Sequence, residues 1–326
     1  MPILSTQLPV VGSNLNRPES VIALADGRLF ACDRECGVIR VGERRDDASR
    51  VKWPYEEFVP NGIALLDDGS FLIANVGPDG GAWRLTGPGR VESYLGEREG
   101  VPSTSLNFLY PDSEGRTWLS LCTKQKPRIL AYKRAHAGDG VIGVVGRSGK
   151  MRVVATGLGF CNELRVDPSG RWLYVNETQA RCLSRFEILA DDQLGPKQIV
   201  TKFGYGTWPD GLDFDVEGGV WITSIISNRL LRVDPTSGRS EIFLEDASED
   251  IIAQAESEFA ADAFGWETVN RGQQFSLRNL SSLAFGGEDL RTVYLGSLFH
   301  NGLSVWRSPV AGHPPDHWTV EKTVID

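Results

Sequence analysis

Short stretches of alternating apolar and polar residues recur along the chain, and six of them share one layout. Each has a polar residue near its start, then an alternating strand, a turn and a second strand. The copies are PESVIALADGRLFA from Pro18, PNGIALLDDGSFLIA from Pro60, LNFLYPDSEGRTWLS from Leu106, CNELRVDPSGRWLYV from Cys161, PDGLDFDVEGGVWIT from Pro209 and LSSLAFGGEDLRTVYLG from Leu280. Alternation with a period of two is typical of strands, so each copy predicts a β-hairpin.

The turns support this alignment, because they lie at a constant distance from the polar residue near the start of each copy. The pairs seven and eight residues after Glu19, Asn61, Asn107, Asn162 and Asp210 are Asp26-Gly27, Asp68-Gly69, Glu114-Gly115, Ser169-Gly170 and Glu217-Gly218. Glycine at the second position suits a hairpin turn that needs a positive φ. The sixth copy has a longer turn, with Gly286-Gly287 in it.

Further alternating stretches follow the hairpins and predict a third and usually a fourth strand in each unit. Examples are GVIRV at 37–41, GAWRL at 81–85, CLSRFEI at 182–188, IVTKF at 199–203, RLLRVD at 229–234 and LSVWRS at 303–308. Four strands every 40 to 50 residues or so is the period of propeller blades. The sequence therefore predicts an all-β protein, a six-bladed β-propeller in which residues 1–326 form a single domain.

Two intervals exceed this period. Between Lys124 and Met151 a basic loop leads into a hairpin at Val141–Val145 with a Gly-rich turn. Between Leu244 and Phe275 the apolar residues Ile251, Ile252, Ala255 and Phe259 recur at helical spacing, which predicts a short acidic helix. This helix is expected as an insertion between blades five and six, where it either lies at the top entrance of the channel or only fills the gap between blades.

The two ends of the chain, TQLPVVG and HWTVEKTVI, are both strand-like. One of them is expected to complete the last blade, because closing the ring leaves fewer open sheet edges.

Charge and cysteine usage limit the class of partner and the compartment. The net charge is −9 and no long basic run is present, which disfavours nucleic-acid binding. No stretch is apolar enough for a membrane span, and the N-terminus lacks the features of a signal peptide. Five scattered cysteines suit a reducing compartment. We therefore expect a cytoplasmic protein with neither nucleic-acid nor membrane partners.

The polar residues near the starts of the six copies are candidates for a functional site. Because the innermost strand of each blade runs along the central channel, these residues should converge on one end of it: Glu19, Asn61, Asn107, Asn162, Asp210 and Ser281. All carry oxygen, and two carboxylates with amide carbonyls are ligands preferred by Ca²⁺ or Mg²⁺. The alternative for any one of them is a turn or capping residue.

With these motifs, the sequence resembles the gluconolactonase, senescence-marker-protein (regucalcin) and luciferin-regenerating-protein family of calcium-dependent six-bladed propellers. The resemblance covers nearly the whole chain and is most specific in GLGFCNELRVDPSGRWLYVNET at 157–178, WPDGLDFDVEGGVWITS at 208–224 and SSLAFGGEDLRTVYLGS at 281–297. It implies one catalytic divalent metal, with Ca²⁺ expected first and Mg²⁺, Mn²⁺ or Zn²⁺ as alternatives. The implied ligands are Glu19, Asn107, Asn162 and Asp210.

Departures from the family pattern bear on the substrate. Ser105 and Phe108 stand where sugar-lactone members tend to have Arg and Asp, and Glu163 replaces a Gly. Phe108 and Trp208, with Phe160, are expected to make the pocket more apolar, which makes gluconolactone itself a doubtful substrate. The expected substrate-binding residues are Asn61, Phe108, Glu163, Trp208 and Ser281.

The resemblance implies a hydrolase that opens a lactone or related small cyclic ester, with the metal polarising the carbonyl group and Asp210 acting as the base on water. Glu163 is a second candidate base. The chain has no G-x-S-x-G elbow, P-loop or G-x-G-x-x-G motif, and its four histidines lack metal-ligand spacing. Two alternatives stay open: an organophosphate-type hydrolase at the same site, and a non-enzymatic propeller that binds calcium or another ligand.

Overall fold

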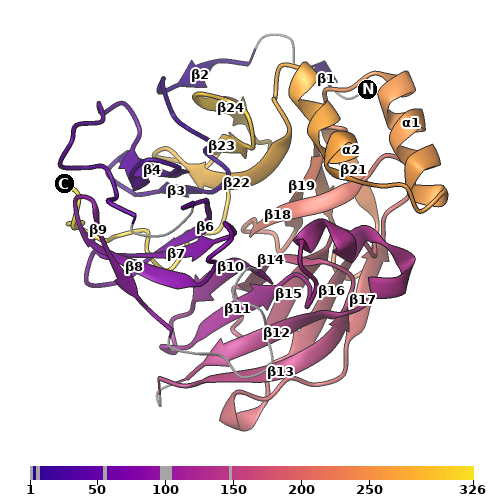
Figure 1. Ribbon diagram of the computed structural model, residues 1–326, viewed down its shortest axis with the longest axis horizontal. Coiled ribbons are helices and arrows are strands. Elements are labelled where there is room, and N and C mark those ends of the chain that lie inside the picture. The colour runs from indigo at the N-terminus through magenta and orange to yellow at the C-terminus, as the bar shows by residue number, and fades with distance from the viewer. Residues whose placement is uncertain (1–2, 5–7, 54–56, 96–104, 147–148) are drawn as a thin grey trace.

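A computed structural model describes residues 3–4, 8–53, 57–95, 105–146 and 149–326. In these residues the strands form six sheets around a common centre (Figure 1), which confirms the predicted six-bladed β-propeller. The first strands of neighbouring sheets contact one another in a closed ring, and blade six returns to blade one. The starts of these six strands therefore surround one channel.

The strands of the first three blades follow the predicted hairpins. Blade one contains β3 (Val21–Ala23), β4 (Leu29–Asp33) and β5 (Gly37–Arg40). Blade two contains β6 (Pro60–Leu65), β7 (Phe71–Asn75), β8 (Ala82–Gly87) and β9 (Arg90–Ser93). Blade three contains β10 (Leu106–Pro111), β11 (Thr117–Leu121), β12 (Gly140–Val145) and β13 (Met151–Leu158).

The last three blades repeat this order, and two of them are extended by strands from the N-terminal region. Blade four contains β14 (Cys161–Val166), β15 (Trp172–Glu177), β16 (Cys182–Glu187) and β17 (Gln198–Lys202). Blade five contains β18 (Trp208–Phe214), β19 (Val220–Ile225), β20 (Arg229–Val233), β21 (Ser240–Glu245) and β1 (Ile3–Leu4). Blade six contains β22 (Leu280–Gly286), β23 (Thr292–Ser297), β24 (Leu303–Arg307) and β2 (Val10–Val11).

The hairpin turns have the predicted chemistry. Gly27, Gly69, Gly115, Gly170 and Gly218 all have φ between 73° and 87°, in the left-handed region that glycine adopts without strain. The hydrophobic core lies between blades: fully buried Trp221 of β19, for example, packs edge-on against Phe285 of β22. Burying one such side chain stabilises the fold by about 1.5–3 kcal/mol.

The ring is closed by the N-terminal region. Strand β2 pairs antiparallel with β24 and completes blade six, as expected for one of the two ends. The expectation of a strand in the C-terminal segment is wrong. Residues 313–326 form turns and irregular backbone, and the segment crosses the far end of β18, where the Val216 amide donates to the Ala311 carbonyl and the His313 amide to the Phe214 carbonyl.

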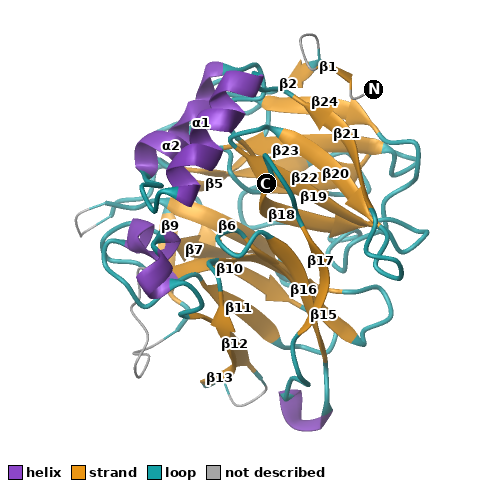
Figure 2. Ribbon diagram, turned by 90° about the vertical axis from the view of Figure 1, so that its right-hand side faces the viewer, coloured by secondary structure: helices purple, strands orange, loops and turns teal. Residues whose placement is uncertain are grey.

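The two intervals that exceed the blade period lie on the same face of the propeller (Figure 2). The predicted helix is α1 (Glu249–Ala260), and it is followed by α2 (Trp266–Asn270) and the 3-10 helix η5 (Arg271–Gln274). The basic loop contains the 3-10 helices η2 (Arg128–Tyr132) and η3 (Arg134–His136) and leads into the β12–β13 hairpin. A further 3-10 turn, η4 (Ala190–Asp192), lies in blade four.

Contacts between the two insertions join them. The Lys133 ammonium donates to the Asp262 carbonyl oxygen at 2.7 Å, and the Arg134 guanidinium donates to the Ala260 carbonyl oxygen at the end of α1. Cations at a helix C-terminus are favoured by the helix dipole. Tyr132 stacks on Phe264 with 4.6 Å between ring centroids. We call the joined segments 124–139 and 249–274 the canopy.

Among the residues described, no helix is long and apolar enough to cross a membrane.

Candidate functional site

Five of the six polar residues that the repeat aligns lie at irregularities of the inner strands. In blades two to six the pairing register shifts at Asn61, Asn107, Asn162, Asp210 and Ser281. Glu19 lies just before β3 in blade one. A bulge bends a strand and redirects its side chains, which explains how a residue on an inner strand can point into the channel mouth.

Hydroxyl groups on the second strands satisfy the backbone amides displaced by these bulges. The Phe108 amide donates to Ser120 Oγ at 3.1 Å, and the Gly211 amide donates to Thr223 Oγ1 at 2.8 Å. Buried amides without partners would cost free energy, so these contacts stabilise the bulged conformation.

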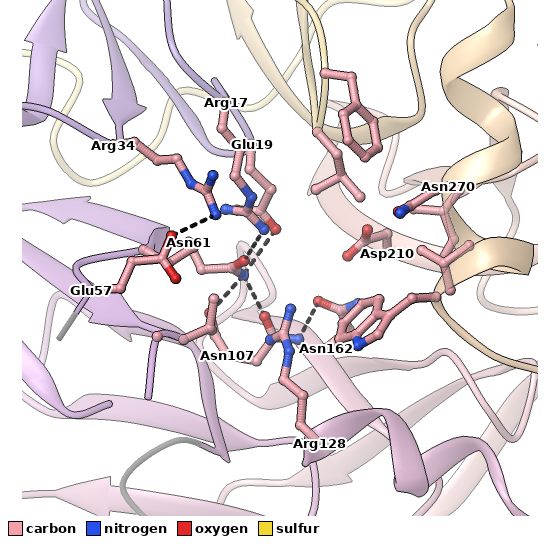
Figure 3. Close-up of a pocket in the computed structure, with 18 of the residues that line it drawn as sticks. Arg17, Glu19, Arg34, Glu57, Asn61, Asn107, Arg128, Asn162, Asp210 and Asn270 are labelled. Carbon is pink, nitrogen blue, oxygen red and sulfur yellow. Dashed lines mark hydrogen bonds and ion pairs between the residues drawn. The ribbon is translucent and has the colours of Figure 1, made fainter. Parts of the chain in front are cut away.

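The converging side chains form a continuous hydrogen-bond chain across four blades (Figure 3). Asn61 Nδ2 donates to Glu19 Oε1 at 2.9 Å and also to Asn107 Oδ1. Asn107 Nδ2 donates to Asn162 Oδ1 at 3.0 Å, and Asn162 Nδ2 donates to Thr178 Oγ1 at 3.0 Å. The amide groups are therefore held in fixed orientations.

Arg17 supports this chain from the side of blade one. Its backbone is in the left-handed region, with φ of 62°, and its guanidinium donates to the Pro60 carbonyl oxygen at 2.6 Å and to Asn61 Oδ1 at 2.7 Å. These contacts orient Asn61.

A cavity of about 1090 Å³ opens at this end of the channel. Five of the six aligned residues line it: Glu19, Asn61, Asn107, Asn162 and Asp210. The opposite wall is largely apolar and includes side chains from blades four to six and the canopy: Tyr132, Phe160, Ile225, Trp266, Val269 and Leu298. The insertion between blades five and six thus forms part of the cavity wall instead of only filling a gap between blades.

The two carboxyl groups of the cavity floor are held in an environment that opposes their charge. Burial raises the pKa of Asp210 well above its ordinary value, and the nearby charge of Glu19 raises it further. Burial likewise raises the pKa of Glu19, although Arg17 and Arg128 act in the opposite direction. Among the described residues, no Lys, Arg or His nitrogen lies within 4.0 Å of either carboxylate.

The residues present fit a hard divalent cation. Glu19 Oε2 is buried without a hydrogen-bond partner, and the two carboxyl groups disfavour each other's charge unless an opposite charge lies between them. Carboxylate and amide oxygens are the donors that calcium and magnesium prefer. No group of three or more His, Cys, Asp or Glu side chains that could hold a metal occurs in the described parts of the chain, so a site here depends on the asparagines.

Of the predicted substrate-binding residues, Asn61 is among the described residues that line the cavity. The other four, Phe108, Glu163, Trp208 and Ser281, are buried and are not in the described lining. Phe108 packs against Gly62, where an added Cβ would lie 2.4 Å from its ring. Glu163 accepts a hydrogen bond from the Leu212 amide at 3.2 Å. Trp208 packs in the cluster that contains Phe264, and Ser281 Oγ donates to the Glu19 carbonyl oxygen at 3.0 Å.

The physical reason is the direction of neighbouring side chains. Phe108 and Glu163 each follow a cavity-facing asparagine in the sequence, and successive side chains on a strand point to opposite faces. Trp208 lies two residues before Asp210, so alternation does not explain its position. Its ring is instead buried by packing against the canopy, with 5.8 Å between the ring centroids of Trp208 and Phe264. The burial of all three is typical of packing and positioning residues, and their predicted contact with substrate stays a prediction.

Several cavity residues were missed by the sequence reasoning. Arg17, Arg128 and Trp266 line the cavity, as does His300. The available signals were the arginine in NRPES and the basic run KQKPR, but their side-chain directions depend on how the loops pack.

The chain was compared with known proteins. Residues 17–243 match the family described as the SMP-30/gluconolactonase/LRE-like region. A 6-deoxy-6-sulfogluconolactonase of Pseudomonas putida is 26% identical over 247 residues, which are 73% of this chain and 69% of that protein.

Solved structures show the same fold at lower identity. A gluconolactonase from Xanthomonas campestris is 15% identical, with a TM-score of 0.61 over 94% of this chain and 97% of that one. A calcium-binding regucalcin from Agrobacterium tumefaciens is 18% identical, with a TM-score of 0.59 over 94% of this chain and 92% of that one.

Proposed function

Since this chain belongs to the SMP-30/gluconolactonase/LRE-like family, we propose that it is a metal-dependent hydrolase that opens the ring of a lactone. One observation carries the proposal: two buried carboxyl groups and three asparagine amides converge at the floor of a cavity of about 1090 Å³. The names of relatives, a 6-deoxy-6-sulfogluconolactonase and a gluconolactonase, support lactone hydrolysis as the reaction.

Glu19, Asn107, Asn162 and Asp210 are the proposed ligands of one divalent cation, with calcium as the first candidate. When bound, such a cation supplies Lewis acidity toward the lactone carbonyl and balances the two carboxylates. Thr178 positions Asn162, because its hydroxyl accepts from Asn162 Nδ2 and donates to the Pro209 carbonyl oxygen at 2.7 Å.

The protein residues have separate tasks in the reaction. Asp210 takes a proton from the attacking water as the water oxygen bonds to the carbonyl carbon. The ring C–O bond then breaks, the leaving oxygen takes up the proton that Asp210 removed from the water, and the product is the open hydroxy acid. Asn61, fixed by Arg17, orients the substrate, and the apolar wall of Tyr132, Phe160 and Ile225 limits access of bulk water.

The test is to measure hydrolysis of sugar, aliphatic and aromatic lactones with Ca²⁺, Mg²⁺, Mn²⁺ or Zn²⁺, with and without a chelator. Asp210→Asn is expected to lower kcat by about 100-fold or more, because a positioned base contributes about that much. Asp213→Asn is the matched control: it alters a buried carboxyl group on the same strand that does not line this cavity, and a change within a few fold is expected. Activity that is indifferent to both the chelator and Asp210→Asn would contradict the mechanism.

A further inference from the structure

The canopy brings an arginine with an unused donor to the cavity. Arg128 begins η2, and its side chain points into the cavity (Figure 3). Its Nη1 atom is buried and has no hydrogen-bond partner among the described residues. A buried guanidinium nitrogen without an acceptor is costly, so it indicates a place for a ligand acceptor.

The other arginines of the cavity have partners. Both terminal nitrogens of Arg17 are engaged by the Pro60 carbonyl oxygen and Asn61. Arg34 lies at 3.3 Å from Glu57 in an exposed ion pair. Arg128 is therefore the arginine of the described lining that retains an unmet donor.

The guanidinium of Arg128 is also held in position. Its central carbon lies 5.5 Å from the centroid of the Trp266 ring, on the other insertion of the canopy. Stacking on an aromatic ring reduces the orientations open to the planar group and leaves its edge for a planar or tetrahedral anion.

The charges of the cavity residues also favour an anionic ligand. If a divalent cation balances Glu19 and Asp210, and Arg34 balances Glu57, the charged groups left among the described lining residues are Arg17, Lys126 and Arg128. All three are positive, and a low-dielectric cavity of one sign concentrates ligands of the opposite sign.

We infer that Arg128 is a specificity residue that binds an anionic substituent of the substrate, a carboxylate or a sulfonate placed away from the lactone carbonyl. This inference rests on the proposed function, which places the lactone carbonyl at the proposed metal ligands, Glu19 and Asp210 among them. The substrate class is thus an acidic lactone.

The test uses two five-membered-ring lactones, the 1,4-lactones of gluconic and of glucaric acid, called gluconolactone and glucarolactone below, which differ in having a hydroxymethyl group or a carboxylate at the far end of the carbon chain. The wild type is expected to prefer glucarolactone in kcat/KM. Arg128→Gln is expected to lower kcat/KM for glucarolactone by about 10- to 100-fold, mainly through KM, as for loss of a charge-assisted hydrogen bond. The value for gluconolactone should change by less than about threefold.

Two further variants distinguish charge recognition from a general role. Arg128→Lys is expected to restore part of the preference, because it keeps the charge without the planar fork. The double variant Arg34→Gln/Glu57→Gln removes a cation of the same cavity together with its ion-pair partner, so the net charge is kept, and it is expected to leave the preference unchanged.

The inference is overturned if the wild type shows no preference, or if Arg128→Gln reduces both lactones equally. Calorimetric binding of both lactones separates this failure from failure of the proposed function. Binding that depends on Arg128 without turnover would contradict the hydrolase proposal alone, whereas turnover without any charge preference would contradict the anion site alone.

Discussion

Two buried aspartates, Asp210 in β18 near the channel mouth and Asp215 just beyond its far end, are in opposite situations. At the far end, Asp215 accepts hydrogen bonds from the Gly219 amide at 2.8 Å, the Trp221 indole at 2.8 Å and the Arg232 guanidinium at 2.6 Å. At the channel mouth, Asp210 has no cationic side chain within 4.0 Å among the described residues. Burial and the charge of Glu19 raise its pKa.

This difference is the one expected between a structural carboxylate, Asp215, and a carboxylate with the role proposed for Asp210. Asp215 closes the hairpin turn, bonds the indole of a core tryptophan and is covered by the C-terminal segment through its bridge to Gly312. Its charge is balanced inside the fold. Asp210 has no such ion pair among the described residues, and burial and Glu19 outweigh the opposing effects of Arg17 and Arg128 on its pKa. This is the arrangement expected where a protein holds a ligand or performs chemistry.

The largest effect on stability is therefore expected at the far end of β18. Asp215→Ala leaves the Trp221 indole and the Arg232 guanidinium without their acceptor, and breaking a buried pair of this kind costs about 3–5 kcal/mol. Urea unfolding, followed by tryptophan fluorescence, measures the loss in free energy of unfolding.

Asp210→Asn, measured in chelator, is the matched comparison. It removes one of two mutually repelling carboxyl groups, so the free energy of unfolding should stay the same or increase. In saturating calcium the wild type should instead be more stable than Asp210→Asn. A ligand at about 100 times its Kd adds about 2.7 kcal/mol to the free energy of unfolding of the wild type, and the variant should not gain this. A loss in chelator as large as that of Asp215→Ala would refute the distinction between the two ends.

The sequence predicted the blades because their signals are local. Alternation and the glycine turns each depend on a few consecutive residues, and six copies in register predicted that Glu19 and Asp210 would converge. The bulges that redirect these side chains, the path of the canopy and the direction of Arg128 depend on packing between distant segments. The alternation in HWTVEKTVI misled for the same reason, since a strand needs a free sheet edge beside it, and β2 completes blade six at β24.

A smaller effect, on calcium affinity, is expected from changes at Asn162 and at Thr178, which positions it. Asn162→Ala should weaken calcium binding by about 10- to 100-fold, and Thr178→Val should do so by about 10-fold, because the hydroxyl group holds the asparagine in place. Titration calorimetry measures both. Thr117→Val, at the start of β11, serves as the control for loss of a buried hydroxyl, as this hydroxyl contacts the Tyr94 hydroxyl at 2.9 Å and Thr117 does not line the cavity at the channel mouth. An affinity unchanged by Asn162→Ala would remove that residue from the ligand set.

The smallest effect is expected on the pH dependence of stability, and it concerns the far end of the channel. There His317 lies with Arg165 and Phe108 around a cavity of about 240 Å³. Burial, with a smaller contribution from Arg165, lowers the pKa of His317 to about 3. A histidine whose folded pKa lies below its unfolded value of about 6.5 stabilises the fold above pH 6.5 or so, and this stability is lost as pH falls toward the folded value.

His317→Gln should therefore be less affected than the wild type when the pH is lowered. Burial raises the pKa of Glu163 and of Asp213, so these two groups change stability in the opposite direction, but they are present in both proteins and cancel in the difference. Relative to the wild type, the variant should gain roughly 1 kcal/mol in free energy of unfolding between about pH 7.5 and pH 5.5. Calcium affinity should remain equal in the two proteins at each pH, because His317 does not line the cavity at the channel mouth. If His317→Gln instead changed calcium affinity and left the pH dependence of unfolding untouched, the two ends of β18 would not be separate, and the structural role assigned to the far end would have to be abandoned.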